Sequence, residues 1–164
     1  MKKGHDGFTL VELVVVVVSI LTLAAVATLY FRSLSEKYQV ESLTKEMYSV
    51  LMRARNDAST TNIPQIVIVT ANSMRSGPDA DGDGNIDGNP VGVVQARYTI
   101  NFGTPNIKFV RPGWTTNIQT LNIAKAPVAG GYSANVDPVM DCIVIAQTRI
   151  NIGKMDGGGN CVQR

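Results

Sequence analysis

Residues 8–31, FTLVELVVVVVSILTLAAVATLYF, decide the fold of this chain. They are mostly apolar and contain one charged side chain, Glu12. At about 1.5 Å per residue, a helix of this length reaches about 36 Å and can cross a bilayer. The five valines 14–18 are poor helix formers in water, but lipid forces the backbone to bond within a helix. Lys2 and Lys3 precede the stretch and predict a cytoplasmic N-terminus.

Three interpretations of this stretch compete. Ala25-Val26-Ala27 would serve as the cleavage site of a secretory signal, although the apolar run is longer than a usual signal core and contains a carboxylate. A plain single-span anchor explains the length and the orientation. It does not explain Glu12, because a charge at mid-bilayer costs roughly 2.5 to 3.5 kcal/mol on insertion scales. The third interpretation accounts for the carboxylate from the residues around it.

The segment Gly4-His5-Asp6-Gly7-Phe8-Thr9-Leu10-Val11-Glu12 follows two lysines and resembles the processing site of type IV pilin and pseudopilin precursors. The resemblance implies a leader of residues 1–7, removed by prepilin peptidase between Gly7 and Phe8, and methylation of the new amine of Phe8. It also implies that Glu12 pairs with this amine on a neighbouring subunit. A buried carboxylate that is paired in this way sets the register of assembly.

The helix is expected to continue beyond the apolar stretch as an amphipathic half over residues 32–62. Apolar side chains recur there close to every 3.6 residues, at Leu34, Tyr38, Leu43, Met47, Val50, Leu51, Ala54 and Ala58. Polar side chains are expected mostly off this stripe, at Glu36, Lys37, Glu41, Lys45, Glu46 and Arg53. Gly and Pro are absent from residues 8–63, which predicts one helix of about 50 residues. Asn62-Ile63-Pro64 is expected to end it.

Residues 63–164 are expected to form a globular β-rich head. Runs of β-branched residues separated by Gly, Pro and Asn predict strands, at residues 66–69, 91–102, 107–110, 118–123 and 139–152. We therefore predict an α+β protein in which the long helix packs on a C-terminal antiparallel sheet. This is the arrangement that the resemblance to pilins also implies.

Two further segments resemble a subgroup of these proteins. Residues 51–58, LMRARNDA, and residues 142–150, CIVIAQTRI, are similar to segments of the GspH/FimT group. That group contains minor type IV pilins and a minor pseudopilin of type II secretion. The resemblance implies a minor subunit.

An acidic segment, Asp79-Ala80-Asp81-Gly82-Asp83-Gly84-Asn85-Ile86-Asp87, reproduces the start of an EF-hand calcium loop. Asp79, Asp81 and Asp83 occupy the first three ligand positions, and Asn85 and Asp87 add further oxygens. Pro90 stands where the bidentate Glu belongs, so we expect weak affinity or a carboxylate from elsewhere. The alternative is a turn-rich solvated loop without metal.

Histidine and cysteine usage limits the chemistry of the chain. The single histidine, His5, lies in the segment expected to be removed, which excludes histidine-dependent triads and metal sites from the mature protein. Cys142 and Cys161 are too few for a thiolate zinc site, and a structural disulfide is predicted. Two free thiols, with Cys142 as a small core residue, are the alternative. We expect no enzymatic activity and no organic cofactor.

The resemblance implies a structural subunit of a type IV pilus or type II secretion filament in the bacterial inner membrane, with a periplasmic head. The implied partners are other pilin or pseudopilin subunits, prepilin peptidase and the inner-membrane assembly platform. A filament-borne module for DNA uptake or surface adhesion is the alternative. The formal net charge is only +2, so nucleic acid is not a favoured partner. The basic residues of the head are scattered in sequence, at Arg97, Lys108, Arg111, Lys125, Arg149, Lys154 and Arg164.

Overall fold

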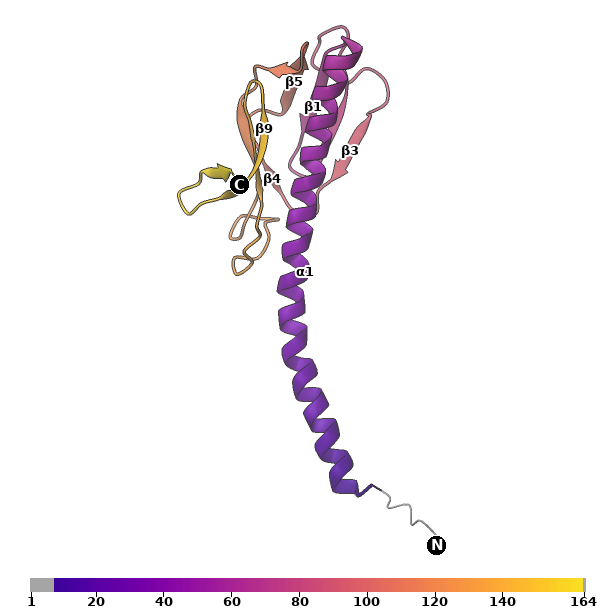
Figure 1. The fold of residues 1–164 in the computed structure, drawn as a ribbon, viewed down its shortest axis with the longest axis vertical. Helices are drawn as coiled ribbons and strands as arrows, with labels where there is room; N and C mark the ends of the chain where they lie inside the picture. Colours follow the sequence, from indigo (N-terminus) through magenta and orange to yellow (C-terminus); the bar gives the residue numbers. More distant parts are fainter. Residues whose placement is uncertain (1–7, 164) are drawn as a thin grey trace. The chain divides into compact units, whose positions relative to one another are not determined.

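The computed structural model describes residues 8–163, apart from the side chains of Val26 and Leu29. Within these residues it contains one helix, α1 (Leu10–Thr61), followed by ten strands (Figure 1). The strands are β1 (Gln65–Val69), β2 (Ser73–Pro78), β3 (Gly92–Gln95), β4 (Ile100–Asn101), β5 (Asn106–Val110), β6 (Trp114–Thr115), β7 (Gln119–Ile123), β8 (Cys142–Ile145), β9 (Ile150–Met155) and β10 (Cys161–Gln163). The chain divides into two compact units between Ser35 and Glu36.

Helix α1 confirms the prediction of a single long helix, since its 52 residues run without interruption. Thr9 caps its start, because its hydroxyl accepts a hydrogen bond of 3.2 Å from the backbone N–H of Glu12. The helix ends at Thr61, and Asn62 follows in the left-handed conformation with φ of 61°. Pro64 then prevents further helix, as the sequence predicted.

The first half of α1 exposes all of its described side chains. From residue 8 to residue 32, each side chain that the structure describes is exposed, and most of them are apolar. By length and composition, the helix contains a stretch apolar enough to cross a membrane.

The second half of α1 buries the predicted stripe, with two exceptions at its start. Leu43, Met47, Val50, Leu51, Ala54 and Ala58 are buried as expected, and the stripe begins at Val40. Leu34 and Tyr38 are 43% and 61% exposed, so the predicted stripe is wrong at these positions. Glu41, which the sequence placed off the stripe, is also buried, and its carboxylate accepts a hydrogen bond from the backbone N–H of Val139.

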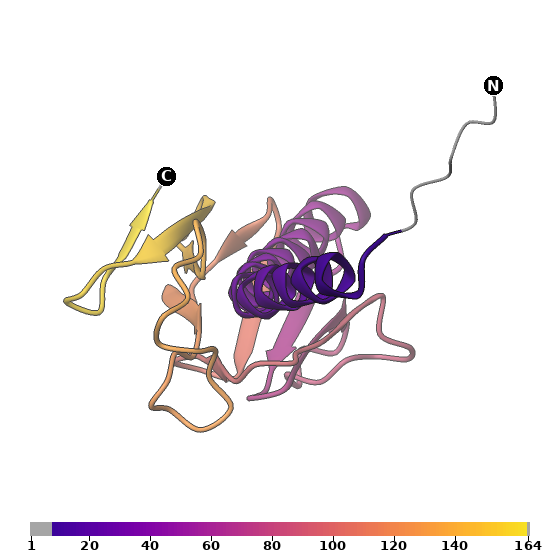
Figure 2. The same ribbon diagram turned by 90° about the horizontal axis from the view of Figure 1, so that it is seen from below.

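The strands form two antiparallel sheets of five strands each, where the sequence predicted one sheet. The first sheet has the order β3-β2-β1-β5-β6, and the second has the order β10-β9-β8-β7-β4. The β-rich run predicted over residues 91–102 is divided between the two sheets, because β3 pairs with β2 while β4 pairs with β7 in the other sheet. The C-terminal hairpin of β9 and β10 lies at the edge of the second sheet (Figure 2).

Both sheets and the second half of α1 share one hydrophobic core. The cluster joins Leu51 of the helix to Val67 and Phe109 of the first sheet and to Leu121 and Ile143 of the second. Each of these side chains is at most 1% exposed. At about 25 cal/mol per Å² of apolar surface, this burial is the main source of stability for the unit that begins at Glu36.

Candidate functional site

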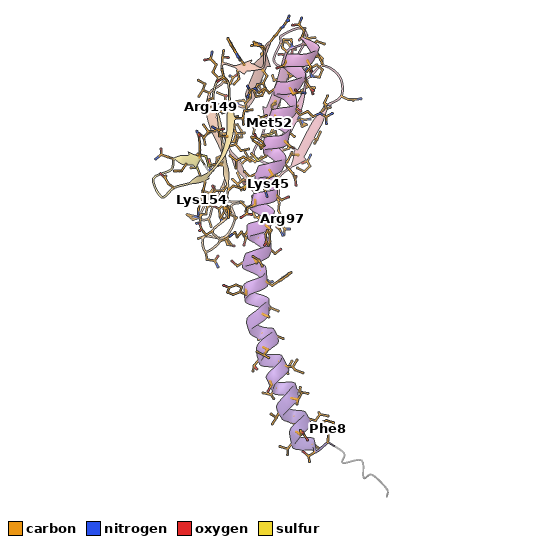
Figure 3. The ribbon with its side chains drawn as sticks, in the orientation of Figure 1. Phe8, Lys45, Met52, Arg97, Arg149 and Lys154 are labelled. Carbon is orange, nitrogen blue, oxygen red and sulfur yellow. A yellow bond between two sulfur atoms is a disulfide. The ribbon has the colours of Figure 1, made fainter. Side chains whose placement is uncertain are left out.

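The N-terminal end of α1 carries the residues that the sequence assigned to processing and assembly. Gly7 lies outside the described residues. Phe8, labelled in Figure 3, and Thr9 precede the helix in a non-helical conformation, and Phe8 is 85% exposed. Glu12 lies in the first helical turn, where the positive end of the helix dipole favours a carboxylate.

Glu12 is also the one acidic or basic residue between Leu10 and Phe31. Among the described residues, none donates a hydrogen bond to its carboxylate. The hydroxyls of Ser19, Thr22 and Thr28 behave differently, because each donates to a backbone carbonyl of the preceding turn at 2.8 to 2.9 Å. Their polarity is therefore satisfied within the helix, whereas the Glu12 carboxylate is exposed and makes no such bond with the described residues.

The acidic loop, residues 79–87, connects β2 toward β3 and gathers three of the predicted metal ligands. One carboxylate oxygen from each of Asp79, Asp81 and Asp83 lies within 4.8 Å of the others. Asp79 is fully buried, while Asp81 and Asp83 are exposed. The Asp79 carboxylate accepts a hydrogen bond of 3.3 Å from the backbone N–H of Gly84, whose φ of 87° bends the loop around it.

The side chains of the other two predicted ligands, Asn85 and Asp87, form hydrogen bonds within the acidic loop. The side-chain amide of Asn85 donates to Asp83 at 2.8 Å, and the carboxylate of Asp87 accepts from the N–H of Ala80 at 2.6 Å. The side-chain and backbone hydrogen bonds from Asn85 hold the pKa of Asp83 below its ordinary value. The structure therefore brings Asp79, Asp81 and Asp83 together and leaves Asn85 and Asp87 in the surrounding loop.

The acidic loop folds over the outer side of the first sheet. Gly77 lies under Ile86, and a Cβ atom at Gly77 would overlap the Ile86 side chain. Asn106 of β5 donates to the carbonyl of Gly84 at 3.1 Å. Also from β5, Nζ of Lys108 lies 2.7 Å from Oδ2 of Asp79.

Sequence reasoning missed Asn106 and Lys108 as neighbours of the acidic loop. The available signal was the alternation along β5, where these two polar residues flank Ile107 and precede Phe109. Ile107 and Phe109 are buried in the core, so the alternating polar side chains point to the other face of the sheet.

In a second buried carboxylate, that of Asp141, both oxygens accept a hydrogen bond. It is 3% exposed, and its Oδ2 accepts a hydrogen bond of 2.7 Å from the Tyr132 hydroxyl. Its Oδ1 accepts from the N–H of Met155, also at 2.7 Å. Burial and this hydrogen bond to Asp141 raise the pKa of Tyr132. Asp141 is therefore a structural group, and its pairing leaves no oxygen without a donor.

Cys142 and Cys161 form the predicted disulfide, with an S–S distance of 2.01 Å and a Cα–Cα distance of 6.0 Å. Cys142 lies on β8 and Cys161 on β10, so the bond ties the last strand to the body of the second sheet. The alternative of two free thiols is wrong.

Not all basic residues of the head lie together. Figure 3 shows Arg97, Arg149 and Lys154 apart from one another. Lys154 lies 2.5 Å from the carboxylate of Asp137, which lowers the pKa of that carboxyl. Arg164 lies outside the described residues.

Comparison with known proteins identifies no relative. No protein-family model matches the chain, and neither a curated protein nor a solved structure matches it.

Proposed function

We propose that this chain is a filament subunit of the type IV pilin and pseudopilin class, anchored in a membrane by the first half of α1. One observation carries the proposal. A single helix of 52 residues buries its second half in the head and leaves the described side chains of its apolar first half exposed.

An exposed apolar surface of this extent needs a covering, because water around it costs free energy in proportion to its area. Lipid covers it before assembly, and neighbouring helices cover it in a filament. Neither lipid nor the interior of a filament supplies water to a polar side chain. The hydroxyls of Ser19, Thr22 and Thr28 are compatible with both environments, because each donates a hydrogen bond within the helix.

Glu12 makes the proposal specific. A plain anchor gains nothing from a carboxylate that costs roughly 2.5 to 3.5 kcal/mol at mid-bilayer. Cleavage before Phe8 would create an amine close to the start of the helix, and that amine on a neighbouring copy is the partner we propose for Glu12. The partners of the chain are then prepilin peptidase, the inner-membrane assembly platform and other subunits of the filament, with the head in the periplasm.

N-terminal mass spectrometry of the chain isolated from its host membrane tests the proposal. We expect a mature chain that begins with N-methylated Phe8. A chain that begins at Thr28 would show a secretory signal instead, and an uncleaved chain that retains residues 1–7 would show a plain anchor. Either result contradicts the proposal.

A further inference from the structure

The two buried carboxylates differ in their hydrogen bonds. Both oxygens of Asp141 accept one, whereas Oδ2 of Asp79 does not. Oδ2 of Asp79 is fully buried and accepts no hydrogen bond from the described residues. The ammonium of Lys108 lies 2.7 Å from this oxygen, but its direction does not make a hydrogen bond. The oxygen is thus neutralised by a charge but not satisfied by an aligned donor, and such burial is costly.

The position of Asp79 suggests what the unsatisfied oxygen is for. The Asp79 carboxylate belongs to a group with Asp81 and Asp83, in which one carboxylate oxygen from each residue lies within 4.8 Å of the others. Like charges this close repel unless a cation lies between them. The Lys108 ammonium is one such cation. It also lies close to the backbone of Gly82, since a Cβ atom there would be 3.6 Å from Nζ.

We propose that the acidic loop binds one calcium ion through Asp79, Asp81 and Asp83, and that the ammonium of Lys108 competes with this ion for Asp79. In the metal-free protein Lys108 stands in for the cation and holds the loop against β5. On binding, calcium takes over Oδ2 of Asp79, and Lys108 turns toward solvent. The Lys108 side chain is already 32% exposed, so this movement requires no opening of the core.

The donor atoms select the class of metal. Carboxylate oxygens are hard ligands, which favour calcium and magnesium over zinc or copper. Magnesium demands a near-ideal octahedron, whereas calcium accepts irregular sets of oxygen ligands together with water. Pro90 supplies no carboxylate at the last position of the loop, and Lys108 opposes the ion. We therefore expect a dissociation constant of about 10⁻⁴ to 10⁻³ M, the range of weak extracellular calcium sites.

Calcium titration of the full chain in detergent, after treatment with a chelator, tests this proposal by calorimetry. We expect one calcium ion per chain and a rise in Tm with calcium concentration, because the ion binds the folded state. The double variant Asp81→Asn with Asp83→Asn should lose the binding. Asp156→Asn is the matched control, since Asp156 is also an exposed loop aspartate and accepts hydrogen bonds from Gly158 and Asn160. It should bind calcium as the wild type does.

A second variant, Lys108→Met, tests the competition directly, because a misfolded protein would not bind calcium more tightly than the wild type. Removing the competing ammonium should tighten calcium binding by roughly five- to tenfold. Unchanged or weaker binding by this variant would overturn the competition. No saturable binding by the wild type, at calcium up to about tenfold above the expected range, would overturn the calcium site. Binding by Lys108→Met alone would likewise overturn it, and would show that Lys108 holds the loop permanently.

The test is independent of the filament proposal. The purified chain either binds calcium or does not, whether or not it is processed before Phe8. Only the filling of the site in the cell depends on the proposed export of the head, since calcium reaches such concentrations outside the cytoplasm.

Discussion

The carboxylate of Glu36 accepts two hydrogen bonds from Ser133, one from the backbone N–H at 2.8 Å and one from the hydroxyl at 2.7 Å. Five residues further along α1, Glu41 accepts a hydrogen bond of 2.8 Å from the N–H of Val139. Both partners lie in the long connection between β7 and β8. Two acidic side chains of α1 therefore hold a connection that has little regular structure of its own.

We expect Glu36→Ala to loosen this connection. The variant leaves the N–H of Ser133 without its partner, and the loss of hydrogen bonds to a charged group costs about 1.5 to 3 kcal/mol. Hydrogen exchange at Ser133 and its neighbours should become faster, while exchange in the strands should change little. Glu46→Ala is the control, because Glu46 is exposed on the same helix and, among the described residues, its carboxylate accepts a hydrogen bond only from the Ser42 hydroxyl. Equal exchange in both variants would contradict the role of Glu36.

The helix was predictable from the sequence because its signals are local. Continuous apolar residues, the absence of Gly and Pro, and Pro64 after the last turn all act within a few residues of where they stand. The division into two sheets was not predictable in this way. Strand β2, with the sequence SMRSGP, contains no β-branched residue, and its conformation depends on pairing with β1.

The surroundings of the acidic loop were likewise only partly predictable from the sequence. Alternating aspartates and Gly84 are visible in the sequence as a calcium-loop pattern. Lys108 stands more than twenty residues away, and only the pairing of β5 with β1 brings it to Asp79. The motif therefore pointed to three aspartates that the structure brings together, whereas the neighbouring ammonium of Lys108 comes from the fold.

Replacement of Glu12 tests the proposed assembly role directly. Glu12→Leu should leave membrane insertion intact or improve it, because it removes an intramembrane charge. It should reduce incorporation into filaments, because the amine of the neighbouring subunit loses its partner. The measurement compares the amount of the chain in the membrane with the amount in sheared or pelleted filaments.

Val16→Leu is the matched control for Glu12→Leu. Val16 is an exposed apolar residue of the same half of α1, and this change adds apolar surface without altering charge. Wild-type levels of assembly in both variants would contradict charge pairing. A loss of membrane insertion in Glu12→Leu would contradict the cost assigned to the carboxylate.

The disulfide between β8 and β10 passes across the intervening strand β9 at Gly153, which has no side chain. Gly153 of β9 lies opposite Cys142 of β8, and β10 follows on the other side. A Cβ atom at Gly153 would lie 2.8 Å from Sγ of Cys161 and 2.5 Å from the carbonyl oxygen of Val162. Glycine is therefore required where the disulfide and β10 approach β9.

Two changes should weaken the attachment of β10. Cys142→Ser with Cys161→Ser opens a loop with a sequence separation of 19 residues, which the chain-entropy model values at about 3 kcal/mol in the free energy of unfolding. Gly153→Ala should cost about 1 to 3 kcal/mol through overpacking, whereas Gly157→Ala meets no atom within 4 Å and is the control. Urea unfolding followed by the fluorescence of Trp114, the single tryptophan, measures both. Unchanged stability on loss of the disulfide, or equal effects of the two glycine substitutions, would show that β10 is held by other contacts.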